Sequence, residues 1–337
     1  MLSAETLITT ETSYEVLTEL NAVEFIASEW NVLLAKSSCN LAFSSAQWFI
    51  ANCRLNRNVE PHVLTARRDD ALVGILPLGR KGSVATFPDD ESDYNDMITA
   101  RDDTATMIGL LDRALSVADY RQLILPRLRD DSNCLRATQI LKPPGILDKP
   151  YRSDTSCPYI RLVSSYPEYL STRSKSFRTS LLQAHKFSER HNVQVRELEP
   201  ESFSPECLPD IFLTLHLSRF AQETCLSSSI AQSFVREVFP SLFAERRLRA
   251  FVLYEADSII GINVCMVGTN SLCLWNGGFT QAAERWSPGM LLISAGIRRA
   301  IDLKLAEYDF LRGKETYKSR WANNARDVGQ LEFQIGP

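Results

Sequence analysis

The chain has 337 residues, of which 45% are hydrophobic and 23% are charged, and its formal net charge at pH 7 is −4. This composition is typical of a globular protein and excludes disorder along the whole chain. The length predicts two domains, and the mild negative charge argues against a protein whose main task is to bind DNA or RNA.

The eight cysteines form no CxxC pair and have no histidine pattern beside them. We therefore expect no metal site and free thiols in a reducing cytoplasm. The first residues lack a basic start and an apolar run, and no stretch approaches the roughly 18 uninterrupted apolar residues of a membrane-spanning helix. The sequence thus predicts neither a secretory signal nor a transmembrane segment.

The first half begins with a polar arm, residues 1–20, in which no element is expected. Apolar residues then recur at helical spacing, after which the pattern changes to the alternation of strands. We expect helices at 23–36, 44–54 and 104–117, a hairpin of strands at 62–67 and 72–78, extended chain at 83–98, and a short strand at 122–125. The PPG at 143–145 marks the end of this half.

The second half has a regular order of predicted elements. It begins with a strand at 158–162 and a helix at 167–190 that is broken near 171–174. There follow a strand at 193–198, helices at 205–222 and 230–244, strands at 249–255, 258–267 and 271–279, a helix at 287–303, a strand at 308–312, a short helix at 314–321 and a strand at 328–335. The three consecutive strands predict an antiparallel meander.

The sequence SPG at 287–289 predicts the start of a helix that can hold an anion. Ser287 is placed to cap the helix, and Pro288 suits its first position. Free main-chain amides and the positive end of the helix dipole suit a diphosphate, and Gly289 permits its close approach. Met290 and Leu291 would supply further amides. The alternative is that SPG is an ordinary helix start.

Several motifs resemble a known family when they are taken in order. YDFLRGKETYKSRW at 308–321 resembles the closing signature of the GNAT-type acetyltransferases that are often linked to bacterial cellulose and exopolysaccharide synthesis, a family related to the FemAB-type peptidyltransferases. Further similar segments are LSTRSKSFRTSLLQA from Leu170, LHLSRF from Leu215, WNGGFTQAAERWSPGMLL from Trp275 and ESDYNDM from Glu91.

The resemblance implies an α/β (α+β) fold of two tandem GNAT-like domains, each a mixed, mostly antiparallel sheet flanked by helices. We expect a degenerate N-terminal domain at 1–150 and the acetyltransferase domain at 151–337. Two departures from the family pattern stand out. The usual glycine-rich phosphate loop is reduced to residues 287–289, and no glutamate is an obvious general base.

The function implied is transfer of an acetyl or other acyl group from acyl-CoA, without a metal, to an amine or hydroxyl of a sugar or polysaccharide precursor. Tyr317 is the expected acid for the thiolate, and Asp309, Glu315 and His216 are candidates for acting on the acceptor. The residues expected at the cofactor are Ser287, Gly289, Met290, Leu291, Arg312 and Lys318. Those expected at the substrate are Asp93, Tyr94, Asp96, Arg178 and Arg219.

Each role has a structural alternative. Tyr317 and His216 could simply pack their helices, and Asp309 could be paired with Arg312 or Lys318. The basic run that contains Arg178 could be a solvated helix face, and the acids from Asp93 to Asp96 an Asp-rich turn.

Two other functions remain open at this point. One is a FemAB-like ligase that uses aminoacyl-tRNA, with the basic segment 173–190 as its RNA track. The other is a binding module that kept the fold but lost the chemistry. The expected location is the cytoplasm or its membrane periphery, where an anionic lipid-linked precursor could be the partner. The sequence does not indicate the oligomeric state.

Overall fold

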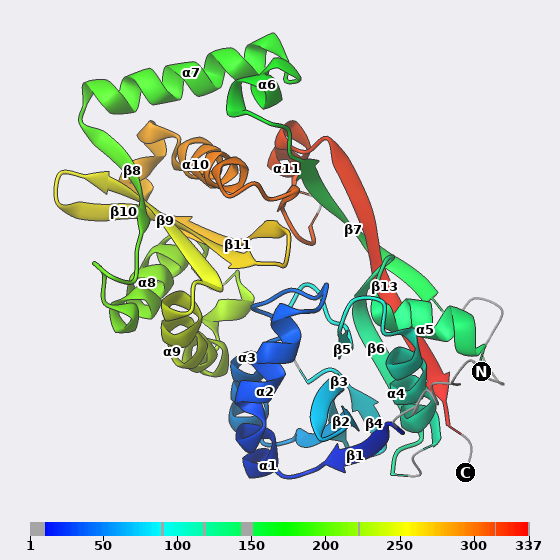
Figure 1. Ribbon diagram of the computed structural model, residues 1–337. Helices are drawn as coiled ribbons and strands as arrows, with labels where there is room; N and C mark the ends of the chain where they lie inside the picture. The colour runs from blue at the N-terminus through cyan, green and yellow to red at the C-terminus, as the bar shows by residue number, and fades with distance from the viewer. Residues whose placement is uncertain are drawn as a thin grey trace, which may run out of the picture.

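The computed structural model describes residues 11–88, 91–116, 119–142, 151–221, 223–313 and 315–335. The strands in these ranges form one sheet in the order β1-β2-β3-β4-β6-β13-β7-β12-β11-β10-β9-β8, with β5 paired to β3 (Figure 1). All pairings are antiparallel except β4 with β6 and β11 with β12. The predicted fold class, a mixed and mostly antiparallel sheet flanked by helices, is confirmed.

The first half supplies one end of the sheet and two groups of helices. Its elements are β1 (Ser13–Leu17), α1 (Leu20–Phe25), α2 (Ala27–Ala35), α3 (Ala46–Leu55), β2 (Glu60–Arg68), β3 (Ala71–Lys81), β4 (Val84–Thr86), β5 (Ile98–Thr99), α4 (Thr104–Ser116), β6 (Gln122–Arg129) and α5 (Asn133–Leu141).

The second half repeats this plan of a hairpin, a helix and a parallel strand. Its strands are β7 (Tyr151–Arg161), β8 (Val193–Leu198), β9 (Leu248–Glu255), β10 (Ser258–Val267), β11 (Ser271–Phe279), β12 (Glu307–Asp309) and β13 (Asn324–Gln334). Its α-helices are α6 (Tyr166–Ser171), α7 (Lys175–Arg190), α8 (Leu208–Phe220), α9 (Ser229–Ala244), α10 (Pro288–Asp302) and α11 (Thr316–Trp321). In Figure 1, α7 and α10 lie on one face of strands β8–β11 and α8 and α9 on the other. Within the described ranges no helix is long and apolar enough to cross a membrane.

The antiparallel meander and the break at 171–174 occur as the sequence predicts. The arm at 1–20 is wrong in part, because Ser13–Leu17 forms β1 and pairs with β2, while residues 1–10 lie outside the described ranges. The helix expected at 23–36 is two helices that meet at Ile26. Helix α5 was not expected, and the PPG at 143–145 lies outside the described residues.

Two of the four buried hydrophobic clusters in the described ranges contain residues of both halves. Trp48 on α3 contacts Phe234 on α9 with the ring centroids 4.8 Å apart, and both side chains belong to the same buried cluster. The last strand, β13, returns to lie between β6 of the first half and β7 of the second. A domain boundary at residue 150 stays a prediction, and β13 pairs with strands on both sides of it.

A buried carboxylate also links the halves. The Tyr94 hydroxyl donates to Asp309 Oδ2 at 2.8 Å, and the Leu311 amide donates to Oδ1 at 2.7 Å. Arg326 on β13 places its Nε 3.7 Å from Oδ2. Burial raises the pKa of the Asp309 carboxyl, and Arg326 opposes that rise. Asp309 therefore joins the end of β12 to Tyr94 in the first half and to β13.

The close contact of α8 with β11 depends on a glycine. A Cβ at Gly278 would lie 2.4 Å from the Leu215 carbonyl and from the His216 nitrogen, both main-chain atoms of α8. Because neither can move without shifting the helix, only glycine fits at this position.

We expect Gly278→Ala to destabilise the protein by about 1–3 kcal/mol, because the helix must move away from the sheet. Gly289→Ala is the matched control, since a Cβ there meets nothing within 4 Å. Urea denaturation of both variants checks this, and equal midpoints for the two would contradict it.

We expect Tyr94→Phe to cost about 1–3 kcal/mol, because it leaves a buried carboxylate oxygen short of a donor. Asp309→Ala should cost at least as much, because the buried Tyr94 hydroxyl and the Leu311 amide lose their acceptor and Arg326 is left with Glu307 alone. Tyr317→Phe serves as the control, since the Tyr317 hydroxyl makes no hydrogen bond within the described part of the chain. A Tyr94→Phe protein as stable as this control in chemical denaturation would show that the link is unimportant.

Candidate functional site

The site forms where two parallel strands separate. β11 and β12 pair over three residues each, from Ser271 with Glu307 to Cys273 with Asp309. β11 then continues to Phe279, whereas the chain after Asp309 turns away through Leu311 (φ 58°) and Gly313 (φ 127°). Beyond Cys273 this edge of β11 has no strand partner in the described ranges, so its main-chain groups can pair with a ligand, apart from the Gly277 carbonyl, which His216 contacts.

A cleft of about 740 Å³ occupies this opening. Its walls come from β11, the start of α10, the segment after β12 and α11, and the first half contributes Glu91 and Asp93. Its volume lies within the roughly 300–1,000 Å³ that is usual for ligand pockets. Of the residues expected from the sequence, the cleft brings together Tyr317, Glu315, Ser287, Gly289, Met290, Arg312, Lys318, Asp93 and Arg219.

The start of α10 presents an open helix end to the cleft. Ser287 occupies the cap position, but its backbone is left-handed (φ 55°) and its side chain makes no capping hydrogen bond, so the predicted side-chain cap is wrong. The amides of Met290 and Leu291 both donate to the Ser287 carbonyl, at 2.9 and 3.3 Å, so the expectation that they supply free amides for a diphosphate is wrong. A Cβ at Gly289 would meet nothing within 4 Å, so this residue faces open space. The first turn can therefore be approached closely by an anion.

Leu291 differs from its neighbours. Its side chain is buried in the core beneath α10, and it does not line the cleft. Met290 is partly buried and does line it.

Two of the expected cations are already paired with acids. Arg312 Nε donates to Asp93 Oδ1 at 2.6 Å, which connects the halves across the cleft. Lys318 is buried, and its Nζ lies 3.1 Å from Glu315 Oε2 and donates to the Arg312 carbonyl. Burial raises the pKa of Asp93, and Arg312 opposes that rise. The pairs hold the chain after β12 in place.

Other cations in the cleft have no acidic partner within the described ranges. The Arg219 guanidinium lies over the rings of Phe220 and Phe279, 4.6 and 4.3 Å from their centroids. Arg320 lies 5.8 Å from the Phe177 centroid. Cations that stack on aromatic rings keep their N–H groups available for an anion.

Tyr317 is a partly exposed phenol in the cleft. Burial raises its pKa to about 12, Glu315 adds to the rise and Arg219 opposes it. The phenol therefore keeps its proton at neutral pH and can act as a donor.

Asp309 and Tyr94 lie outside the cleft, bonded to each other in the buried link. The partner of Asp309 is Arg326 rather than Arg312 or Lys318. His216 is also enclosed, with Nδ1 3.0 Å from the Gly277 carbonyl and Nε2 2.8 Å from Thr224 Oγ1. Burial lowers the pKa of His216, so it is held neutral with both nitrogens occupied.

The last two expected residues lie elsewhere. Asp96 accepts hydrogen bonds from the amides of Asn133, Cys134 and Met97, and so caps α5. Burial raises its pKa to about 6, although these bonds oppose the rise. Arg178 is exposed on the outer face of α7, outside the cleft.

Sequence reasoning missed several residues of the cleft. Glu91 accepts from the Cys225 thiol at 3.5 Å, and its carbonyl accepts from Trp275 Nε1 at 3.1 Å. Glu284 reaches the cleft from the loop before α10. Glu91 begins the ESDYNDM motif and could have been found there, but its contact with β11 depends on the fold. Within the described ranges no group of three or more His, Cys, Asp or Glu residues is placed to hold a metal ion.

Comparisons with known proteins bear on the domain and the fold. Residues 175–319 match the family model described as an acetyltransferase (GNAT) domain, and no curated protein matches the chain. The solved structure of FemX is similar, with a TM-score of 0.64, 11% identity, and coverage of 96% of this chain and 97% of FemX.

Two further structures are similar along most of their lengths. The C-terminal domain of a putative lysylphosphatidylglycerol synthetase from Agrobacterium fabrum has a TM-score of 0.59 at 11% identity, covering 94% of this chain and 93% of its own. L-PGS from Bacillus licheniformis has a TM-score of 0.58 at 11% identity, covering 90% of each chain. At such identities the likeness is one of fold. The chain thus carries a match to the GNAT acetyltransferase domain, which spans α7 to α11, within a fold similar over nearly its whole length to that of FemX.

Proposed function

We propose that the protein is an acyltransferase that moves an acetyl or other acyl group from acyl-CoA to an amine or hydroxyl of a sugar or polysaccharide precursor. The observation that carries the proposal is the open edge of β11 beside the accessible first turn of α10. Coenzyme A offers a diphosphate and an extended arm with amide groups. A helix start suits the first, and an unpaired strand edge suits the second.

The cleft also offers groups for the chemistry. The acceptor nitrogen or oxygen would attack the thioester carbonyl, the acyl bond would form, and the carbon–sulfur bond would break. The departing thiolate needs a proton, which the Tyr317 phenol can supply because its raised pKa keeps it protonated. The acceptor must lose a proton, and Glu91, Glu284 and Glu315 place carboxylates in the cleft for that step.

The saccharide acceptor rests on the resemblance of the sequence motifs. Aromatic walls from Trp275, Phe279 and Phe310 and the acids of the cleft suit a ring that bears hydroxyl or amino groups. Under this proposal the acceptor would enter on the side of Glu91 and Asp93, opposite α10.

The second candidate is a ligase that takes its acyl group from aminoacyl-tRNA, as the similarity to FemX suggests. The observation that favours it is the exposed basic face of α7, where Lys175, Arg178, Lys186 and Arg190 form no ion pair with any described residue. Such a face could follow the backbone of an RNA. A third candidate is a binding module without activity, for which the lack of a single evident base is the support.

We expect acetyl-CoA to bind in isothermal titration and to raise the melting temperature. Gly289→Trp should weaken binding at least tenfold, because its side chain covers the helix start, whereas Gly289→Ala should stay within a few fold of the wild type. Absence of both heat and stabilisation would count against the first candidate. Salt-dependent binding of tRNA in its place would favour the second.

Replacing Tyr317 by phenylalanine should lower kcat by about 10²–10⁴-fold with little change in KM, since only proton donation is lost. Release of free thiol from acetyl-CoA over a panel of amines and amino sugars measures this. Tyr254→Phe, on β9 and outside the cleft, is the matched control. Full activity of the Tyr317 variant would remove the phenol from the mechanism, and no turnover by the wild type with any acceptor would favour the binding module.

A further inference from the structure

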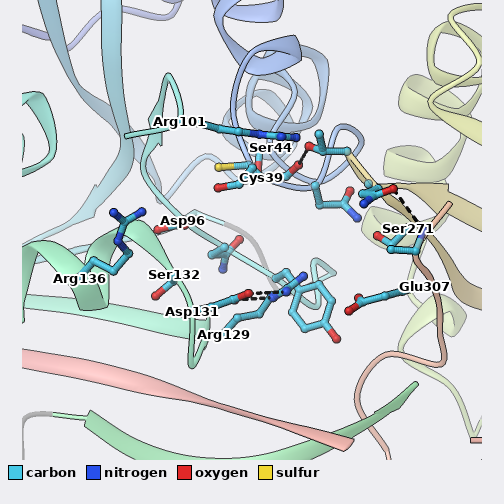
Figure 2. Close-up of a pocket in the computed structure, with 18 of the residues that line it drawn as sticks. Cys39, Ser44, Asp96, Arg101, Arg129, Asp131, Ser132, Arg136, Ser271 and Glu307 are labelled. Atoms are coloured by element: carbon cyan, nitrogen blue, oxygen red, sulfur yellow. Dashed lines mark hydrogen bonds and ion pairs between the residues drawn. The ribbon is translucent and has the colours of Figure 1, made fainter. Parts of the chain in front are cut away.

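A second cavity, of about 380 Å³, lies between the halves, and Figure 2 shows residues that line it. The first half lines it with parts of residues 38–44, 94–102 and 129–136. The second half adds the turn between β10 and β11 and the starts of β11 and β12. We call it the junction cavity.

The junction cavity is separate from the cleft. Within the described ranges no residue lines both. Asp93 lines the cleft and Tyr94, the next residue, lines the junction cavity, where its ring and its hydrogen bond to Asp309 form part of the wall. A ligand in the junction cavity would therefore lie apart from the open edge of β11.

Most acids of the junction cavity are already satisfied by partners. Asp131 accepts two hydrogen bonds from Arg129, at 2.8 and 2.7 Å, drawn as dashed lines in Figure 2. Asp96 is occupied by three main-chain amides, and Glu307 is paired with Arg326. These acids therefore add little negative charge that a ligand would meet.

Two cations of the junction cavity remain without a partner. Arg101 and Arg136, both labelled in Figure 2, form no ion pair and no side-chain hydrogen bond with any described residue. Asp102, beside Arg101, is the one lining acid of the described chain for which no partner is found. The unpaired groups thus carry a positive surplus, and guanidinium groups match the geometry of a phosphate or carboxylate.

A hydroxyl in the wall adds a second kind of contact. Ser44 is only 8% exposed as a residue and lines the junction cavity, and its Oγ makes no hydrogen bond within the described part of the chain. This hydroxyl is therefore available to a polar group of a ligand or to water. Ser38 supplies an exposed hydroxyl, and the Asn270 amide also borders the space.

We propose that the junction cavity binds a small anionic sugar, with Arg101 and Arg136 supplying the positive charge of its wall, one of them holding the phosphate or carboxylate, and Ser44 bonding a ring hydroxyl. The volume exceeds what one inorganic anion needs and lies at the lower end of the usual range for ligand pockets, roughly 300–1,000 Å³. This site goes beyond the acyl transfer proposed for the cleft, and it does not depend on it.

The test is isothermal titration calorimetry, in which glucose 6-phosphate or glucuronate is titrated into the full chain. Glucose and inorganic phosphate are the comparison ligands, because each lacks one half of the proposed chemistry. We expect at least one anionic sugar to bind tenfold or more tightly than both. Glucose 6-phosphate alone would identify the anion as phosphate, and glucuronate alone would identify it as carboxylate.

At least one of Arg101→Gln and Arg136→Gln should weaken this binding tenfold or more, and that variant identifies the arginine that holds the anion. Arg113→Gln, at an exposed arginine of α4 without an ion pair in the described ranges, is the matched control and should bind as the wild type does. Ser38→Trp should block the junction cavity by filling it from an exposed position, without removing a charge.

Three results would overturn the proposal: no binding of either anionic sugar at millimolar concentration, equal binding of inorganic phosphate, or unchanged binding by both arginine variants. Acetyl-CoA titrated into the same proteins should bind equally to all of them, since none of these residues lines the cleft. Loss of acetyl-CoA binding in the cleft and loss of sugar binding in the junction cavity can therefore be told apart.

Discussion

The hydrogen bond between Tyr94 and Asp309 is the contact around which both cavities are arranged. It joins the first half to the end of β12 where the strands β11 and β12 part. The cleft lies at this opening, and Tyr94 lines the junction cavity. Because the carboxylate is fully buried, it requires the amide of Leu311 and the nearby charge of Arg326 as well. Asp309, which the sequence allowed as a catalytic acid or base, therefore has a structural role in this link.

The elements of the second half could be predicted well, because their patterns are long and their turns are marked. The meander at 249–279 and the helix from Pro288 follow from alternation, helical spacing and a Pro-Gly start. The short strand β1 and helix α5 could not be predicted in the same way. β1 spans five residues and gains its stability from pairing with β2, which no local pattern reveals.

The candidate site could be predicted only where its residues lie close together in the sequence. Residues 287–290 form the start of α10, and Arg312, Glu315, Tyr317 and Lys318 lie just before or at the start of α11, so each group reaches the cleft from one short stretch of sequence. The roles of His216 and Asp96 were open, because their partners, Gly277 and the start of α5, lie 61 and 37 residues away along the chain. The pairing of Asp93 with Arg312 spans 219 residues and depends on how the halves pack.

The position of segment 91–96 gives the first half a part in both cavities. Glu91 and Asp93 at its start line the cleft, whereas the following residues, Tyr94 to Asp96, line the junction cavity. Its ends are fixed by the contact of Glu91 with Trp275 and by the capping of α5 by Asp96. A shift of this segment would therefore alter the wall of the cleft and the wall of the junction cavity together. The Tyr94–Asp309 link and the ion pair of Asp93 with Arg312 join segment 91–96 to the chain after β12, and the contact of Glu91 with Trp275 joins it to β11, so these contacts couple the two spaces.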